Sequence, residues 1–114
     1  MAAQNTEIGD ELYAEIARRI VEAVHPKRVI LFGSRARGDA RSDSDVDIFV
    51  EMKTREHPID RGLKIRRLFR DRTWPMDILV YTPEEVDARR NSLASIVPDI
   101  LKEGRTLYEQ AAND

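Results

Sequence analysis

The sequence predicts an α/β (α+β) fold in which helices pack on a small mixed or antiparallel sheet. Three short apolar runs have the length of strands, at 27–32, 45–51 and 76–81. Helical and turn-forming segments separate them, without the regular alternation of a doubly wound parallel sheet. Because 114 residues suffice for one hydrophobic core, we expect a single domain over 1–114.

The first element is an amphipathic helix. Apolar residues recur every four positions from Ile8 to Val24, and His25 and Pro26 end the pattern. The spacing predicts a helix of about four or five turns. The run 27–32 that follows is short and apolar, and it predicts the first strand.

A turn and a second strand come next. Gly33 and Ser34 directly follow the first apolar run, at the point where a strand should end. A short helix or loop is expected over 35–41. Turn-forming residues at 42–44 precede the second strand, 45–51.

Residues 59–71 predict a strongly basic helix. Its narrow apolar stripe would consist of Leu63, Leu68 and Phe69, with Ile65 less well placed. Between 61 and 72 there are six arginine or lysine residues and one acid. A solvated helix face is the usual explanation for such a run. Binding of an acidic partner or of RNA is the alternative.

The last third of the chain predicts a strand and further helices. The strand 76–81 is followed by Thr, Pro and two acids at 82–85, which is typical of a helix start. Apolar residues from Leu93 to Leu101 have helical spacing, and Pro98 should kink this element or divide it into two short helices. A short edge strand is expected over 105–108.

Composition excludes several classes of site and favours a cytoplasmic protein. The chain has no cysteine, which excludes disulfides, zinc-thiolate sites and thiol nucleophiles. It has neither an apolar run long enough to span a membrane nor a signal pattern, so we expect no membrane association. The net charge of −2 argues against direct nucleic-acid binding by bulk electrostatics.

The stretch from Gly33 to Asp47 has the composition of half a phosphoryl-transfer site. A turn at Gly33 and Ser34 offers backbone N–H groups to an anion. Asp45 and Asp47 are two apart in a strand, so they share one face. Two adjacent carboxylates raise each other's pKa unless a cation lies between them, and a hard ion such as Mg²⁺ fits oxygen ligands. The opposite face should point into the core: Val46, Ile48 and Val50.

A third acid, Asp77, lies on the third predicted strand. Together with the Gly33-Ser34 turn, Arg35, Gly38 and the run 44–47, it resembles the nucleotidyltransferase superfamily related to DNA polymerase β. The chain is most similar to the minimal nucleotidyltransferase (MNT) group, which includes MntA-like antitoxins. The resemblance covers nearly the whole chain.

The resemblance agrees with the chemistry of these residues and implies their roles. The catalytic residues and Mg²⁺ ligands, for two ions, would be Asp45, Asp47 and Asp77. The residues that bind the nucleotide, with ATP as substrate, would be Gly33, Ser34 and Arg35. Spacing leaves open whether Arg35 or Arg37 faces the phosphates.

The resemblance also implies a reaction and a partner. A nucleoside monophosphate, AMP from ATP, would be transferred to a hydroxyl acceptor. MNT proteins are commonly antitoxins of helical HEPN toxins, and some modify a toxin tyrosine, as in a type VII-like toxin–antitoxin pair. Because so short a chain leaves little room for an acceptor pocket, we expect a second, helical protein to provide the acceptor or its binding surface.

Two alternatives remain at this point. The chain could be a non-catalytic partner-binding module whose nucleotide site is vestigial, or the catalytic subunit of a small-molecule nucleotidyltransferase. Homo- and hetero-oligomers both stay open.

Overall fold

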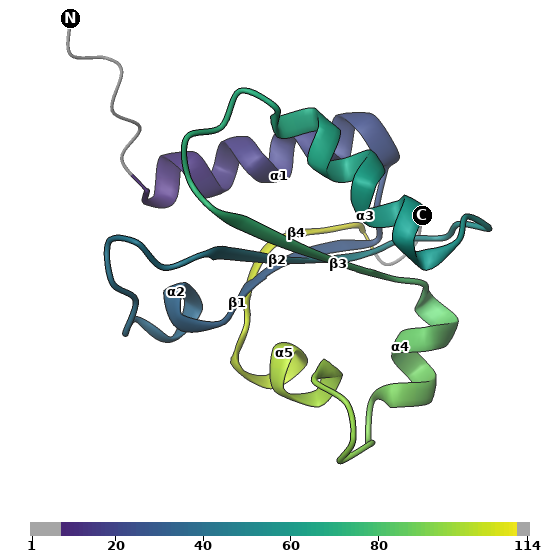
Figure 1. Ribbon diagram of the computed structural model, residues 1–114. Helices are drawn as coiled ribbons and strands as arrows, with labels where there is room; N and C mark the ends of the chain where they lie inside the picture. The colour runs from purple at the N-terminus through teal and green to yellow at the C-terminus, as the bar shows by residue number, and fades with distance from the viewer. Residues whose placement is uncertain (1–7, 112–114) are drawn as a thin grey trace, which may run out of the picture.

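A four-stranded mixed sheet lies at the centre of the computed structural model, which describes residues 8–111 (Figure 1). The strands are β1 Arg28–Phe32, β2 Val46–Glu51, β3 Met76–Tyr81 and β4 Arg105–Glu109, in the order β3-β2-β1-β4. β1 is antiparallel to both β2 and β4, whereas β2 and β3 are parallel. The predicted α+β class and the edge strand at the C-terminal end are confirmed.

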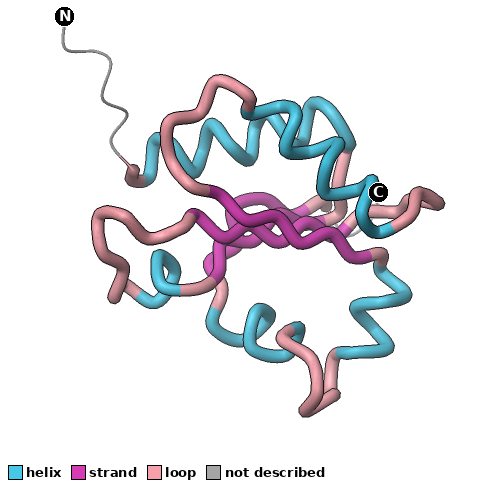
Figure 2. The backbone as a smooth tube through the Cα atoms, viewed as in Figure 1, coloured by secondary structure: helices cyan, strands magenta, loops and turns pink. Residues whose placement is uncertain are grey.

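Helices cover both faces of this sheet (Figures 1 and 2). One face carries α1 Asp10–Val24, α3 Pro58–Arg66 and the 3₁₀ turn η2 Arg67–Phe69. The other carries α4 Pro83–Arg89 and α5 Val97–Glu103. Among the described residues, no helix has the length and apolar character needed to cross a membrane.

The strand β2 separates two hydrophobic cores. Val46, Ile48 and Val50 are fully buried in the core beneath α1 and α3, as their alternation predicts. Phe49 is fully buried in the second core, with residues of α4 and α5. Asp47 therefore lies on the α5 side of the sheet.

The predicted apolar stripe of the basic helix is confirmed at Phe69 but wrong at Leu63. The buried positions are Arg61, Ile65 and Phe69, spaced by four residues, whereas Leu63 is 40% exposed. A helix presents residues four apart on one face, and this face meets the sheet at Ile65 rather than at Leu63. The expected solvated basic face is also wrong for Arg61.

Arg61 joins three segments below the surface. Its guanidinium donates hydrogen bonds to the carbonyl oxygens of Glu56 (2.9 Å) and Val80 (3.4 Å) and to Oε1 of Glu85 (2.8 Å). Glu85 also accepts from the N–H of Thr82, in a capping box that starts α4 as predicted. The ion pair thus holds α3 against β3 and α4.

Glu85→Gln is expected to lower the free energy of unfolding at pH 7 by about 1.5–3 kcal/mol, the scale of a hydrogen bond to a charged group. The hydrogen bond from Arg61 lowers the pKa of Glu85. Its contribution is therefore present above the ordinary carboxyl pKa and is lost as pH falls through the lowered one. Urea unfolding at several pH values checks this, with exposed Glu84→Gln as the control. Equal destabilisation at acid and neutral pH would contradict it.

The second helical segment is shorter than predicted. α5 begins at Val97, so Pro98 lies in its first turn, where a proline is well tolerated, instead of inside a longer helix. Leu93 does not belong to the helix and is fully exposed in the connection after α4. The apolar spacing over 93–101 is therefore only partly a helical face.

Candidate active site

The predicted turn after β1 is formed by Gly33. Its φ of +75° and ψ of −157° lie in a region that residues other than glycine essentially do not adopt. It precedes the short helix α2, Ser34–Arg37, whose Ala36 and Arg37 donate their N–H groups to the Gly33 carbonyl. A Cβ on Gly33 would overlap Oδ2 of Asp47. The turn therefore lies directly against that carboxylate.

Sheet register places Asp47 between the other candidate elements. It pairs with Phe32, the last residue of β1, on one side and with Asp77 of β3 on the other. Asp45 lies two residues earlier, exposed, just before β2. The structure thus brings the turn and the three predicted acids to the same end of the sheet.

The surroundings of Asp47 favour a bound cation. Burial raises the pKa of this carboxyl, and the nearby charges of Asp77 and Asp45 raise it further, against smaller effects of Arg37 and Arg35. A divalent ion would relieve this repulsion, and carboxylate oxygens are ligands that Mg²⁺ prefers. The carboxylate oxygens of Asp47 and its two acidic neighbours therefore have the ligand chemistry that Mg²⁺ prefers.

The third acid, Asp77, forms an ion pair with an arginine. The Asp77 carboxylate lies 3.3 Å from Nη2 of Arg66 in a half-exposed ion pair. Within residues 8–111, no three acidic or histidine side chains are arranged as a set of metal ligands. Sequence reasoning missed Arg66, whose only signal was the basic run around it.

Arg35 holds the loop that carries Asp45. Its guanidinium donates to the carbonyl oxygens of Ser44 (2.9 and 3.1 Å), Arg41 (3.1 Å) and Ser42 (3.2 Å). The Arg35 side chain, for which the resemblance implied nucleotide binding, therefore donates to three carbonyls of this loop. This geometry gives Arg35 a positioning role for the loop.

A cleft of about 260 Å³ opens beside Asp47. Arg37 and Gly33 line one side of it, and Phe32 and Asp47 line it from the sheet. The other side comes from α5 and its flanks, which the sequence analysis did not include in the site: Ile96, Asp99, Ile100, Glu103 and Gly104. Their only sequence signal is that two acids alternate with isoleucines at helical spacing.

Comparison with known proteins identifies the family of this fold and cleft. Residues 13–107 match the family described as the nucleotidyltransferase domain. The chain belongs to this family. The match spans the Gly33 turn, all three acids and α5, and thus every segment of the candidate site described above.

Solved structures share the architecture of this nucleotidyltransferase domain. A Sulfolobus solfataricus protein assigned as a nucleotidyltransferase is 25% identical with a TM-score of 0.63, over 88% of this chain and 79% of that one. A chain of a toxin–antitoxin structure with AMP-PNP is 19% identical with a TM-score of 0.60, over 88% and 76%, and shows the fold alone. No curated protein gives a match.

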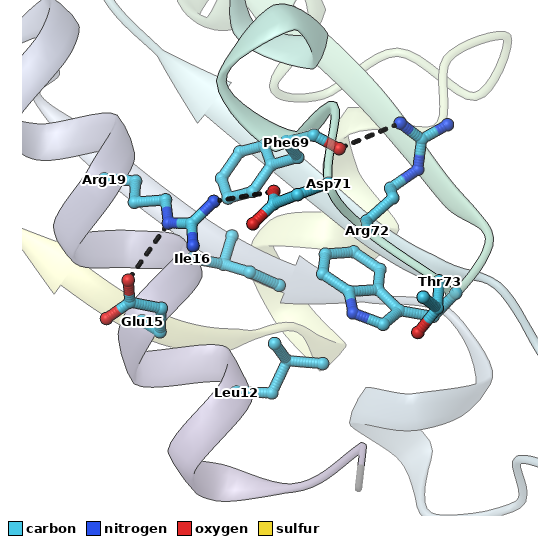
Figure 3. A pocket seen from close by; sticks show the side chains of 9 residues that line it. Leu12, Glu15, Ile16, Arg19, Phe69, Asp71, Arg72 and Thr73 are labelled. Atoms are coloured by element: carbon cyan, nitrogen blue, oxygen red, sulfur yellow. Dashed lines mark hydrogen bonds and ion pairs between the residues drawn. The ribbon is translucent and has the colours of Figure 1, made fainter. Parts of the chain in front are cut away.

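A second hollow of the nucleotidyltransferase domain lies on the opposite face of the sheet. It has a volume of about 190 Å³ and lies between α1 and the segment from Phe69 to Trp74 (Figure 3). Its cation, Arg19, is already paired with Glu15 at 3.0 Å and with Asp71 at 3.2 Å. Because these charges satisfy one another away from Asp47, we assign no chemistry to this hollow.

Proposed function

We propose that this domain transfers a nucleoside monophosphate from a Mg²⁺-bound nucleoside triphosphate, ATP, to a hydroxyl acceptor. The observation that carries the proposal is the position of Asp47. Its carboxylate lies in a cleft, directly against a glycine turn and close to the charges of two further acids at one end of the sheet. Anion-binding backbone and metal-binding oxygens thus meet at one place.

The proposed roles follow from this arrangement. Asp45 and Asp47 would hold two Mg²⁺ ions with the help of Asp77, and the bound metal would neutralise the triphosphate and polarise the reacting phosphate. Gly33 and Ser34 would donate backbone N–H groups to the β- and γ-phosphates.

In the proposed reaction, the acceptor oxygen bonds to the α-phosphorus while the bond to the bridging oxygen breaks. Pyrophosphate leaves with that oxygen. Asp77 receives the acceptor proton, on a carboxylate whose Oδ1 is now paired with Arg66 at 3.3 Å.

We propose a helical partner protein as the source of the acceptor. The likeness to a chain of a toxin–antitoxin structure and the resemblance to MNT antitoxins both support this. In this proposal, AMP transfer to a tyrosine of a HEPN toxin neutralises the toxin, and the present chain is the antitoxin.

Label transfer from ATP tests the proposal. With Mg²⁺ and the protein encoded beside this chain, label from α-labelled ATP should appear on that protein, whereas γ-label should leave as pyrophosphate. Asp45→Asn and chelation of Mg²⁺ should each abolish transfer, while Asp43→Asn in the adjacent turn should not. Transfer that survives Asp45→Asn and chelation would contradict the catalytic assignment.

The ion pair between Asp77 and Arg66 favours one alternative, a non-catalytic module that neutralises its partner by contact. In that case toxin activity falls with no label transferred. Label on a small hydroxyl compound instead of a protein would indicate the catalytic subunit of a small-molecule nucleotidyltransferase.

The two arginines of α2 are expected to differ when replaced. Arg37 lines the cleft beside Asp47, so Arg37→Ala should weaken ATP binding by about tenfold, as expected for one charged hydrogen bond. Arg35→Ala should instead lower the melting temperature, because three carbonyls of the 41–44 loop lose their donor. Calorimetric titration and thermal unfolding of both variants check this. Equal loss of ATP affinity without destabilisation in Arg35→Ala would show that Arg35 contacts the phosphates after all.

A further inference from the structure

One face of α5 and its N-cap residue form a wall of the cleft. Ile96, Asp99, Ile100 and Glu103 all line it, at the spacing i, i+3, i+4, i+7 that places residues on one side of a helix. Apolar and acidic side chains thus alternate along this wall. Ile96 is 45% exposed, so an apolar surface is available at the rim.

The wall is held firmly against the sheet. Ile100 is buried in the second core together with Phe32 of β1. At the end of the helix, a Cβ on Gly104 would overlap Ile30 and the Ile100 carbonyl, so no space remains there. Close packing of this kind fixes where the backbone of α5 lies relative to β1.

The two ends of the cleft carry different charged residues. Arg37 of α2 and the Gly33 turn lie on one side, whereas Asp99 and Glu103 lie on the other. Within residues 8–111, neither of these two carboxylates makes a side-chain hydrogen bond or an ion pair. Both are exposed acceptors that repel phosphate and attract hydrogen-bond donors.

We infer that the α5 wall binds the nucleoside half of the substrate, an inference that rests on the proposed function. Asp99 and Glu103 accept hydrogen bonds from nucleoside donors, and Ile96 packs against the base or sugar. The triphosphate lies at the Gly33 and Arg37 end. The shared chemistry is donation to a carboxylate, from the ribose hydroxyls or from an exocyclic amine of the base.

A set of four ligands tests this on the whole chain in the presence of Mg²⁺. ATP carries both kinds of donor, 2′,3′-dideoxy-ATP lacks the ribose hydroxyls, purine riboside triphosphate lacks the amine, and tripolyphosphate lacks the nucleoside. Calorimetric titration should show ATP binding about tenfold more tightly than at least one of the two analogues, as expected for a hydrogen bond to a charged group. The weaker analogue identifies the donor that α5 binds.

The double variant Asp99→Ala, Glu103→Ala should lose about tenfold in ATP affinity and should no longer distinguish ATP from that analogue. Its affinity for tripolyphosphate should not fall, because the phosphate end is intact. Glu84→Ala, which removes an exposed acid from the first turn of α4, is the matched control. Circular dichroism checks that the variants fold.

Three results would overturn the inference: wild-type protein that binds ATP and both analogues equally, a double variant with unchanged ATP affinity, or equal losses for ATP and tripolyphosphate. If label transfer proceeds and any of these is seen, the proposed function stands without the inference. If ATP is bound selectively and the double variant loses that selectivity, but no label is transferred in the presence of the partner, only the catalytic proposal fails.

Discussion

Asp47→Asn is expected to reduce AMP transfer by about 10³-fold or more, since metal-dependent charge stabilisation is worth several kcal/mol in a phosphoryl-transfer site. Asp47 is the acid that lies against the Gly33 turn and pairs in register with Asp77. Asparagine keeps the shape of the side chain but removes the charge that would hold Mg²⁺. Single-turnover label transfer at saturating ATP measures the loss.

The same variant should not be less stable than the wild type. The pKa of Asp47 is raised in the fold, first by burial and then by Asp77 and Asp45. Above this raised pKa the ionised carboxylate therefore costs folding free energy, and below the ordinary pKa of an aspartate the cost disappears. Without Mg²⁺, Asp47→Asn should melt at or above the wild-type temperature at pH 7, and the difference should shrink toward acid pH.

This stability measurement separates catalysis from folding. A variant that loses activity because it unfolds would melt at a lower temperature than the wild type, both with and without Mg²⁺. If Asp47→Asn melts well below the wild type at pH 7, the carboxylate has a structural role and the assignment to metal binding is contradicted. Asp43→Asn, in the turn before β2, provides the matched loss of one charge.

Local patterns predict where the glycine turn and the first two acids lie in the fold. Period-2 alternation predicts Asp47 on the side of β2 opposite to Val46 and Val50, and a glycine after an apolar run predicts the turn. These features depend on a few neighbouring residues. Parallel pairing of β2 with β3 then brings Asp77 beside Asp47, as the resemblance to polymerase β-like nucleotidyltransferases implied.

Such local patterns do not predict the contacts of long side chains, or which distant segments line the cleft. Arg35 bonds to the 41–44 loop, and Arg66 pairs with Asp77, because a flexible guanidinium goes to whichever acceptors the tertiary fold brings within reach. The acids of α5 join the cleft only because that helix packs on β1 beside the Gly33 turn. The spacing of residues along the sequence does not predict these contacts.

The difference between local patterns and tertiary contacts also explains the errors in the predicted fold. Strand positions and the Thr82 cap depend on local residues, and they are confirmed. Apolar residues alone define a stripe that includes the exposed Leu63, whereas Arg61 is buried with a carboxylate and two carbonyls as partners. Because the buried guanidinium of Arg61 has hydrogen-bond partners, position 61 belongs to the buried face of α3.

Gly33→Ala is the second substitution with a large expected effect. The new Cβ would overlap Oδ2 of Asp47, and the carboxylate is the part that can move. A displacement of about 1 Å at a reacting centre can cost roughly 10²-fold in rate, so transfer should fall by about that factor. The positive φ adds about 1–3 kcal/mol of backbone strain, which thermal unfolding should detect.

Gly38→Ala separates these two effects. Gly38 also has a positive φ, of +88°, but a Cβ there would meet no atom within 4 Å. Its replacement should therefore lower the melting temperature through strain and leave label transfer nearly unchanged. If Gly38→Ala and Gly33→Ala lose activity equally, then loss of the turn geometry, and not displacement of the Asp47 carboxylate, explains both. A loss confined to Gly33→Ala would tie the glycine turn to the chemistry through its contact with Asp47.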